Sequence, residues 1–147
     1  MTQLTSLRLG ATAVLVPLAL LAACTTPPSV LASRCSGGTL QGYDCTVTVE
    51  SFDAPTSGSL KAADRARNVT IEGTITVRSG SVEVSIGDGS ANPDGAYTVT
   101  VTPDSPQEVS ATVRTSRRIS EDETLILVKA TPLEPSEGLT MTLHYDD

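Results

Sequence analysis

Apolar and polar residues alternate one by one through most of the chain beyond residue 44. Successive side chains of an extended strand point to opposite faces, so this period of two predicts strands with one apolar and one polar face. The alternation holds over residues 45–50, 69–78, 81–86, 97–102, 109–113 and 139–145, and residues 125–128 are apolar on both sides. Such strands bury their apolar faces when two sheets stack. The sequence therefore predicts an all-β fold, a single antiparallel β-sandwich of about seven strands that is loosely Ig-like, with a small open barrel as the alternative.

One segment departs from this alternation. Residues 51–67 are too many for a hairpin, and residues 59–66 are rich in helix-forming side chains. We expect a loop that crosses between the sheets and contains about one helical turn. Loops of this length often carry function, yet a simple crossover connection fits the same residues. Both interpretations remain open.

The first 24 residues carry a different pattern. Residues 1–8 hold one positive charge, residues 11–21 are almost entirely apolar, and Leu21, Ala22 and Ala23 lead into Cys24. This run resembles the signal peptide and lipobox of bacterial lipoproteins. A transmembrane helix is one alternative, but it needs roughly 20 apolar residues, and Pro17 fits a cleaved leader better. A secretory peptide that is cut elsewhere is the other alternative.

The resemblance implies that residues 1–23 are removed and that the sulfur of Cys24 receives a diacylglyceryl group, often with acylation of the new α-amine. Residues 24–43 would form the acylated cysteine and a flexible tether rich in Pro, Ser and Gly, and residues 44–147 the sandwich. The protein would be exported and anchored by lipid to the cell membrane or outer membrane, facing the periplasm or the cell exterior. The acyl chains then supply the membrane affinity.

Two cysteines remain after lipidation of Cys24. Exported proteins sit in an oxidising compartment, so Cys35 and Cys45 are predicted to form a disulfide bond. Free thiols or a metal site are the alternatives, but two thiols without a nearby histidine make an incomplete zinc site.

The charge balance excludes one class of partner. The chain has 17 acidic and 10 basic residues and a net charge of −7, and the leader removes only Arg8. A nucleic-acid-binding protein carries a basic surface instead, so we expect no nucleic-acid partner.

The motifs of known catalytic sites are missing from the sequence, and we expect neither an enzyme nor a cofactor. No GxSxG, HExxH or phosphate-binding glycine loop occurs. The only histidine, His144, falls on the polar side of the last predicted strand and is expected to face solvent without a catalytic triad. Arg114, Arg117 and Arg118 precede an acidic stretch at 121–123 and are expected to pair with it at the surface.

One loop between predicted strands carries alternate oxygen-bearing side chains that resemble the opening of a calcium loop. These candidate ligands are Asp88, Ser90, Asn92 and Asp94. Pro93 stands where an EF-hand requires glycine, and Val99 stands where its bidentate glutamate belongs. The ligand set is therefore incomplete, and a polar hairpin loop is the competing interpretation.

The sequence favours a non-enzymatic interaction or structural module of the cell envelope, with an unidentified envelope protein or glycan as its partner. A carbohydrate-binding module is the alternative. Such modules stack sugars on exposed aromatic rings. We expect Tyr43 and Phe52 to be exposed and Tyr97 and Tyr145 to face inward.

The lipobox resemblance makes a direct prediction. The substitution Cys24→Ser removes the sulfur that receives the lipid, so the variant is expected to lose firm membrane association, while the Cys35–Cys45 bridge still forms. Detergent-phase partitioning measures the first result. A variant that still partitions as a lipoprotein at full mature size would show that the lipobox assignment is wrong.

Overall fold

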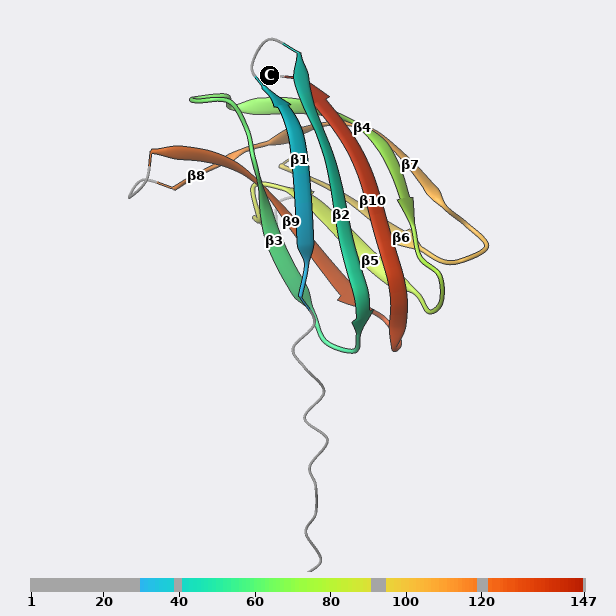
Figure 1. Cartoon of the computed structure of the whole chain (residues 1–147). Helices are drawn as coiled ribbons and strands as arrows, with labels where there is room; N and C mark the ends of the chain where they lie inside the picture. The colour runs from blue at the N-terminus through green and yellow to red at the C-terminus, as the bar shows by residue number, and fades with distance from the viewer. Residues whose placement is uncertain (1–29, 39–40, 91–94, 119–121, 147) are drawn as a thin grey trace, which may run out of the picture.

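The computed structural model describes residues 30–38, 41–90, 95–118 and 122–146, and the regular structure in these ranges consists of strands (Figure 1). In chain order the strands are β1 (Ala32–Gly38), β2 (Gly42–Phe52), β3 (Thr56–Lys61), β4 (Asn68–Thr76), β5 (Val82–Gly87), β6 (Ala96–Val101), β7 (Gln107–Arg114), β8 (Ser116–Arg118), β9 (Glu123–Pro132) and β10 (Ser136–Asp146).

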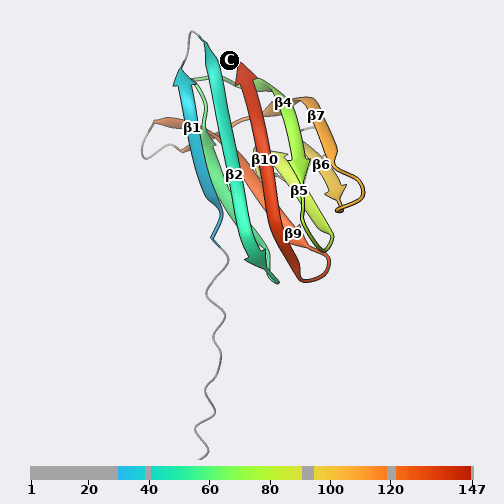
Figure 2. The ribbon, with the colours of Figure 1, turned by 45° about the vertical axis from the view of Figure 1, so that its right-hand side comes forward.

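The strands form two antiparallel sheets. The first sheet has the order β1-β2-β10-β4-β7, and the second has the order β3-β9-β5-β6, with β8 pairing to β9. The two sheets face each other, and Figure 2 shows the first sheet in front of the second. The predicted antiparallel β-sandwich is confirmed, although the described residues form ten strands rather than about seven.

The three additional strands are β1, β3 and β8, and they lie at sheet margins. A marginal strand can be held by backbone hydrogen bonds to one neighbour, so it needs few apolar side chains. The residues of β1 are exposed from Ala32 to Gly37. The expected boundaries were therefore wrong. β1 lies within residues 24–43, which were assigned to the tether, and the sandwich starts at Ala32 rather than at residue 44.

The helical turn expected within residues 51–67 was also wrong. The structure has β3 there, paired with β9 from Thr56 opposite Ala130 to Lys61 opposite Leu125. Leu60 and Ala62 are 1% and 0% exposed, because they point into the space between the sheets. Burial of these two side chains and the pairing with β9 outweigh the weak helix preference of the segment.

The apolar side chains of the two sheets meet in one core. Met141 and Ile75 of the first sheet and Ile126 and Val84 of the second are 0% exposed. Phe52 is only 4% exposed, which corrects its expected exposure. It lies at the end of β2, where β10 still pairs with it through Ser136.

The predicted disulfide bond is confirmed. Cys35 of β1 and Cys45 of β2 are partners in the antiparallel register, and their Cα atoms are 4.1 Å apart. The bond therefore fastens a marginal strand with exposed side chains to a strand that lies inside the first sheet.

The predicted signal peptide and Cys24 lie outside the described residues. Within the part of the chain that is described, no helix is long and apolar enough to cross a membrane.

The bridge should contribute measurably to stability. We expect the double variant Cys35→Ser/Cys45→Ser to lose about 2–3 kcal/mol of unfolding free energy, because the bond closes a loop of sequence separation 10 in the unfolded chain. Urea unfolding measures the loss. Ser33→Ala, an exposed change on β1, is the control. Equal unfolding midpoints for the double variant and the native chain would contradict the prediction.

Candidate functional site

The predicted calcium loop is only partly described. Asn92 and Asp94 lie outside the described residues, while Asp88 and Ser90 lie within them. The backbone N–H of Ser90 donates a hydrogen bond to Asp88 Oδ1 at 2.8 Å. The side-chain and backbone hydrogen bonds from Ser90 lower the pKa of Asp88, and the charge of Arg114 adds to this more weakly. Among the described residues, no group of three or more His, Cys, Asp or Glu side chains is placed to hold a metal ion. The calcium site stays a prediction.

The outer face of the first sheet carries a regular set of hydroxyl groups. Neighbouring strands place three threonines side by side in each of two adjacent rows, which we call the hydroxyl array. The rows are Thr46–Thr142–Thr74 and Thr48–Thr140–Thr76, across β2, β10 and β4. Neighbouring strands are about 4.8 Å apart, so the hydroxyls within a row repeat at about that distance.

The residues between the two rows explain why the array faces outward. Val47, Met141 and Ile75 separate the threonines of each strand, and all three are 0% exposed in the core. Because successive side chains alternate between faces, their threonine neighbours must lie on the outer face.

A row of charged and polar residues follows the hydroxyl array toward the C-terminal end of β10. It contains Ser36, Asp44, His144, Glu72 and Ser110, one from each strand of the first sheet in spatial order. We call it the His144 row. The alternation of β10 placed His144 on the outer face, as expected, and its side chain is 44% exposed.

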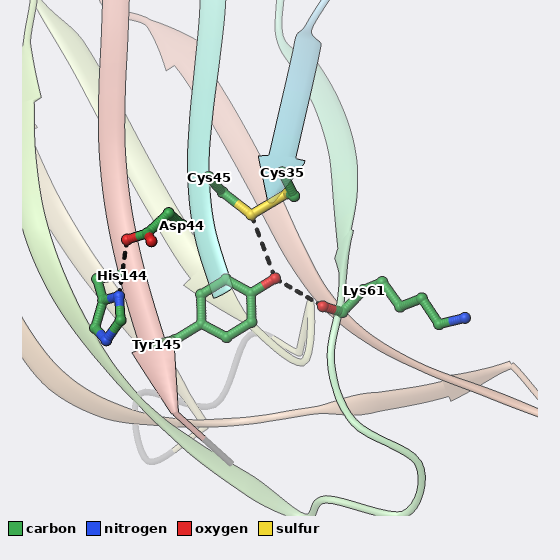
Figure 3. The surroundings of a disulfide bond; sticks show 6 residues. All are labelled: Cys35, Asp44, Cys45, Lys61, His144 and Tyr145. Atoms are coloured by element: carbon green, nitrogen blue, oxygen red, sulfur yellow. Dashed lines mark hydrogen bonds and ion pairs between the residues drawn. A yellow bond between two sulfur atoms is a disulfide. The ribbon is translucent and has the colours of Figure 1, made fainter. Parts of the chain in front are cut away.

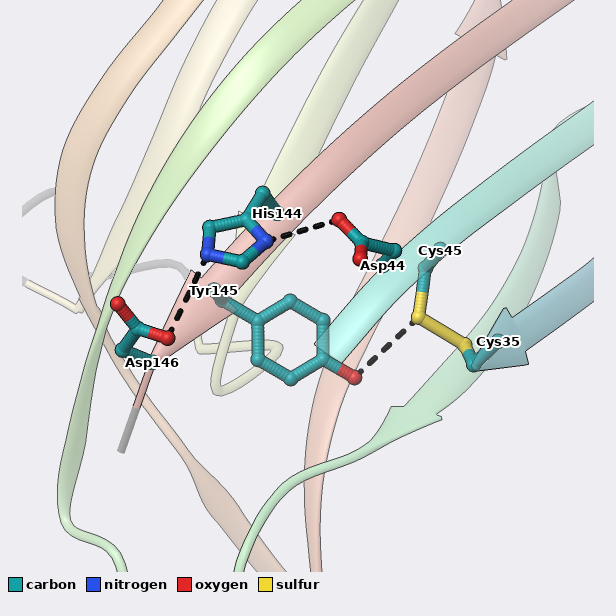
Figure 4. Close-up of polar contacts among 6 residues, drawn as sticks. All are labelled: Cys35, Asp44, Cys45, His144, Tyr145 and Asp146. Carbon is teal, nitrogen blue, oxygen red and sulfur yellow. Dashed lines mark hydrogen bonds and ion pairs between the residues drawn. A yellow bond between two sulfur atoms is a disulfide. The ribbon is translucent and has the colours of Figure 1, made fainter. Parts of the chain in front are cut away.

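His144 is held between two carboxylates (Figure 4). Its Nδ1 lies 2.8 Å from Asp44 Oδ1, and its Nε2 lies 3.4 Å from Asp146 Oδ1. The hydrogen bond to Asp44 is the main cause that raises the pKa of His144, and the negative charges of Asp146 and Glu72 add to it. Asp44 is 100 residues away in the sequence, so local pattern analysis could not find this contact.

Tyr145 supports this end of the sheet from the inner side (Figure 3). It is 1% exposed, its hydroxyl donates a hydrogen bond to the Lys61 carbonyl at 2.7 Å, and the same oxygen lies 3.4 Å from Cys45 Sγ. Because Lys61 ends β3, the Tyr145 hydroxyl joins the first sheet to the second. The strand that carries His144 is therefore fixed to both the disulfide and the opposite sheet.

The chain's four aromatic residues are all described, and they do not form an exposed platform. Tyr145 and Phe52 are buried. Tyr43 is half-buried and stacks on Tyr145 with ring centroids 5.2 Å apart, which corrects its expected exposure. Tyr97 is also half-buried and donates a hydrogen bond to the Glu108 carbonyl at 3.4 Å. A ligand of the outer face would meet hydroxyl and charged groups rather than ring faces.

The predicted pairing of arginines with the acidic stretch at 121–123 is found for Arg117. Its guanidinium forms an ion pair with Asp122. Glu123 Oε1 instead lies 4.0 Å from Lys61 Nζ of β3. Glu121 is outside the described residues.

No family model and no curated protein matches the chain. Among solved structures, it is similar to the family 11 carbohydrate-binding module of the cellulosomal cellulase Lic26A-Cel5E of Clostridium thermocellum, with 13% identity, a TM-score of 0.39, and coverage of 80% of this chain and 82% of that chain. A CBM4 structure has 17% identity, a TM-score of 0.32, and coverage of 78% and 74%. The module CBM6cm-2 from Cellvibrio mixtus lichenase 5A, in complex with cellotriose, has 14% identity, a TM-score of 0.33, and coverage of 83% and 90%. At these values the similarities do not bear on the function of this chain.

The His144 row predicts a pH response. The folded pKa of His144 is raised above its ordinary value of 6.5, so the stability from its contacts is fully present below about that pH and is lost as the pH rises through the folded pKa. Because the chain has one histidine, NMR titration of its imidazole gives this pKa directly. We expect Asp44→Asn to lower the pKa more than Asp146→Asn does, and Glu50→Gln, elsewhere on β2, to leave it unchanged. An unchanged pKa in Asp44→Asn would contradict the assigned contact.

Proposed function

We propose that the protein is a lipid-anchored module of the bacterial cell envelope whose β-sandwich binds a partner and does not catalyse a reaction. The observation that carries this proposal is the outer face of the first sheet, where the hydroxyl array and the His144 row lie side by side across adjacent strands. Such a face offers many hydrogen-bonding groups in fixed positions.

The geometry around His144 supports binding over catalysis. A general base needs a ring nitrogen that is free to take a proton from a nucleophile or a water molecule. Both nitrogens of His144 lie against carboxylates, Nδ1 against Asp44 and Nε2 against Asp146. Both nitrogens of the imidazole are therefore already engaged by carboxylates of the protein.

The direction of the strands supports display away from a membrane. β1, which starts at Ala32, is the first described strand after the proposed lipid anchor at Cys24, and β10 ends at the opposite end of the sandwich (Figure 1). His144 and Asp146 lie near that far end, since His144 is opposite Asp44, and Asp44 is opposite Ser36 near the end of β1. In an anchored protein, the His144 row would face the space beyond the membrane surface.

Carbohydrate binding is the second candidate, and the hydroxyl array favours it. Threonine hydroxyls both donate and accept hydrogen bonds, as sugar hydroxyls do. An extended glycan lying along the array would meet two rows of three threonines. Tyr145 and Phe52 are buried, Tyr43 stacks on Tyr145, and Tyr97 is half-buried on the second sheet, so hydrogen bonds rather than ring stacking would hold a sugar on the array.

The double variant Thr142→Val/Thr74→Val tests the surface. Valine keeps the shape and the strand preference of threonine but removes the hydroxyl, so the fold should persist while binding weakens by roughly tenfold for two lost hydrogen bonds. Binding is measured with the full chain in detergent on an array of bacterial envelope polysaccharides and purified envelope proteins.

The control is Thr98→Val/Thr100→Val, which makes the same chemical change on β6 of the second sheet, where both threonines are exposed. Loss of binding in the first variant alone supports the proposed surface. The immobilised probe that loses signal, a polysaccharide or a protein, identifies the kind of partner. Equal loss in both variants, or unchanged binding in the first, would contradict it.

A further inference from the structure

Arginine side chains gather around one pocket at the end of the sandwich where β3 and β7 finish. The pocket has a volume of about 380 Å³, and the residues that line it are Arg65, Ala66, Arg67, Arg114, Thr115, Arg117 and Thr124. Three parts of the chain supply the arginines: the β3–β4 connection, the last residue of β7, and β8. The pairing of Asn68 with Arg114 brings the first two parts together.

The backbone around this arginine pocket is fixed by hydrogen bonds. The N–H of Arg65 donates to Thr124 Oγ1 at 3.1 Å, and the N–H of Thr115 donates to the Arg67 carbonyl at 3.1 Å. The Thr115 hydroxyl donates to the Ala66 carbonyl. Thr124 itself is only 2% exposed, so it anchors the connection to a buried position of β9. The backbone of the pocket is thus held in place without a ligand, which reduces the entropic cost of binding.

The charges in the pocket are unbalanced. Arg117 has an ion pair with Asp122, but no ion pair with a described residue is found for Arg65, Arg67 or Arg114. The described lining contains no acidic side chain, although the charge of Arg114 contributes to lowering the pKa of nearby Asp88. A group of cationic side chains in a chain of net charge −7 concentrates positive potential at one place.

We propose that the arginine pocket binds a phosphate or sulfate group carried by a molecule of sugar size. The planar guanidinium group donates paired hydrogen bonds that match the oxygens of such an anion. Three arginines without a described carboxylate partner suit a dianion or a strongly charged ester better than a single carboxylate. The volume is within the range of about 300–1,000 Å³ typical of small-molecule sites and exceeds the need of a bare ion.

This inference does not depend on the lipid anchor or on the hydroxyl array. The pocket is built from the β3–β4 connection, β7, β8 and β9, whereas the array lies on β2, β10 and β4. Each proposal can therefore fail while the other stands.

Calorimetric titration of the full chain in detergent at low ionic strength tests the pocket with four probes: glucose 6-phosphate, glucose 6-sulfate, inorganic phosphate and glucose. We expect saturable binding of at least one sugar ester and at least roughly tenfold weaker binding of glucose. Inorganic phosphate that binds as tightly as the esters would contradict the sugar-sized part of the ligand, because the sugar would then add nothing to binding by the anion site.

The variants Arg67→Gln and Arg114→Gln are each expected to weaken ester binding by roughly tenfold. Arg34→Gln is the matched control, because it removes the same charge from exposed β1 outside the pocket lining. Thermal unfolding confirms that each variant is folded.

Three results would overturn the proposal. The first is a lack of saturable binding to any anionic probe. The second is an equal loss of affinity in Arg34→Gln, which would reveal attraction to net charge alone. The third is binding of glucose that matches the esters and is insensitive to Arg67→Gln and Arg114→Gln.

Discussion

The apolar side chains packed between the two sheets fix the register of the strands, and the arrangement of the outer face depends on that register. A shift of one residue in any strand would move its apolar side chains to the opposite face, so the core fixes each strand against its neighbours. Val47, Met141 and Ile75 meet the second sheet from adjacent strands. Their threonine neighbours must then align on the outer face. The hydroxyl array is thus a geometric consequence of the same register that builds the core.

The sequence predicted the strands whose side chains alternate between core and solvent, and it missed those that do not. β1 has exposed residues from Ala32 to Gly37, so no apolar period marks it. β3 contains Ser57, Gly58 and Ser59, and its buried residue Thr56 is polar, so Leu60 and the following Ala62 are the apolar inward residues of this segment. Pairing with a neighbour creates these marginal strands, and such pairing leaves no apolar period in the strand's own sequence.

The same distinction applies to the sites. Alternation placed His144 outward, and the count of cysteines, together with the expectation of export, predicted the Cys35–Cys45 bond. The contact with Asp44 depends on the register between β2 and β10, and the arginine pocket depends on the register between β4 and β7. Phe52 and Tyr43 were expected to be exposed, because nothing in the sequence shows that β2 is covered along its whole length.

The position of the disulfide is significant for an anchored protein. Any pull on the proposed tether enters the sandwich at Ala32, the first residue of β1, which pairs only with β2. If the strand is peeled away from its first residue, Ala32, Ser33 and Arg34 part first from Thr48, Val47 and Thr46. The next pair is Cys35 with Cys45, where a covalent bond stops the separation. Beyond it, Tyr145 packs beside the bond, and its hydroxyl donates a hydrogen bond to the Lys61 carbonyl of the second sheet. In an anchored protein, the bond would thus transfer a pull on the N-terminal segment from β1 to β2 and the interior of the sandwich.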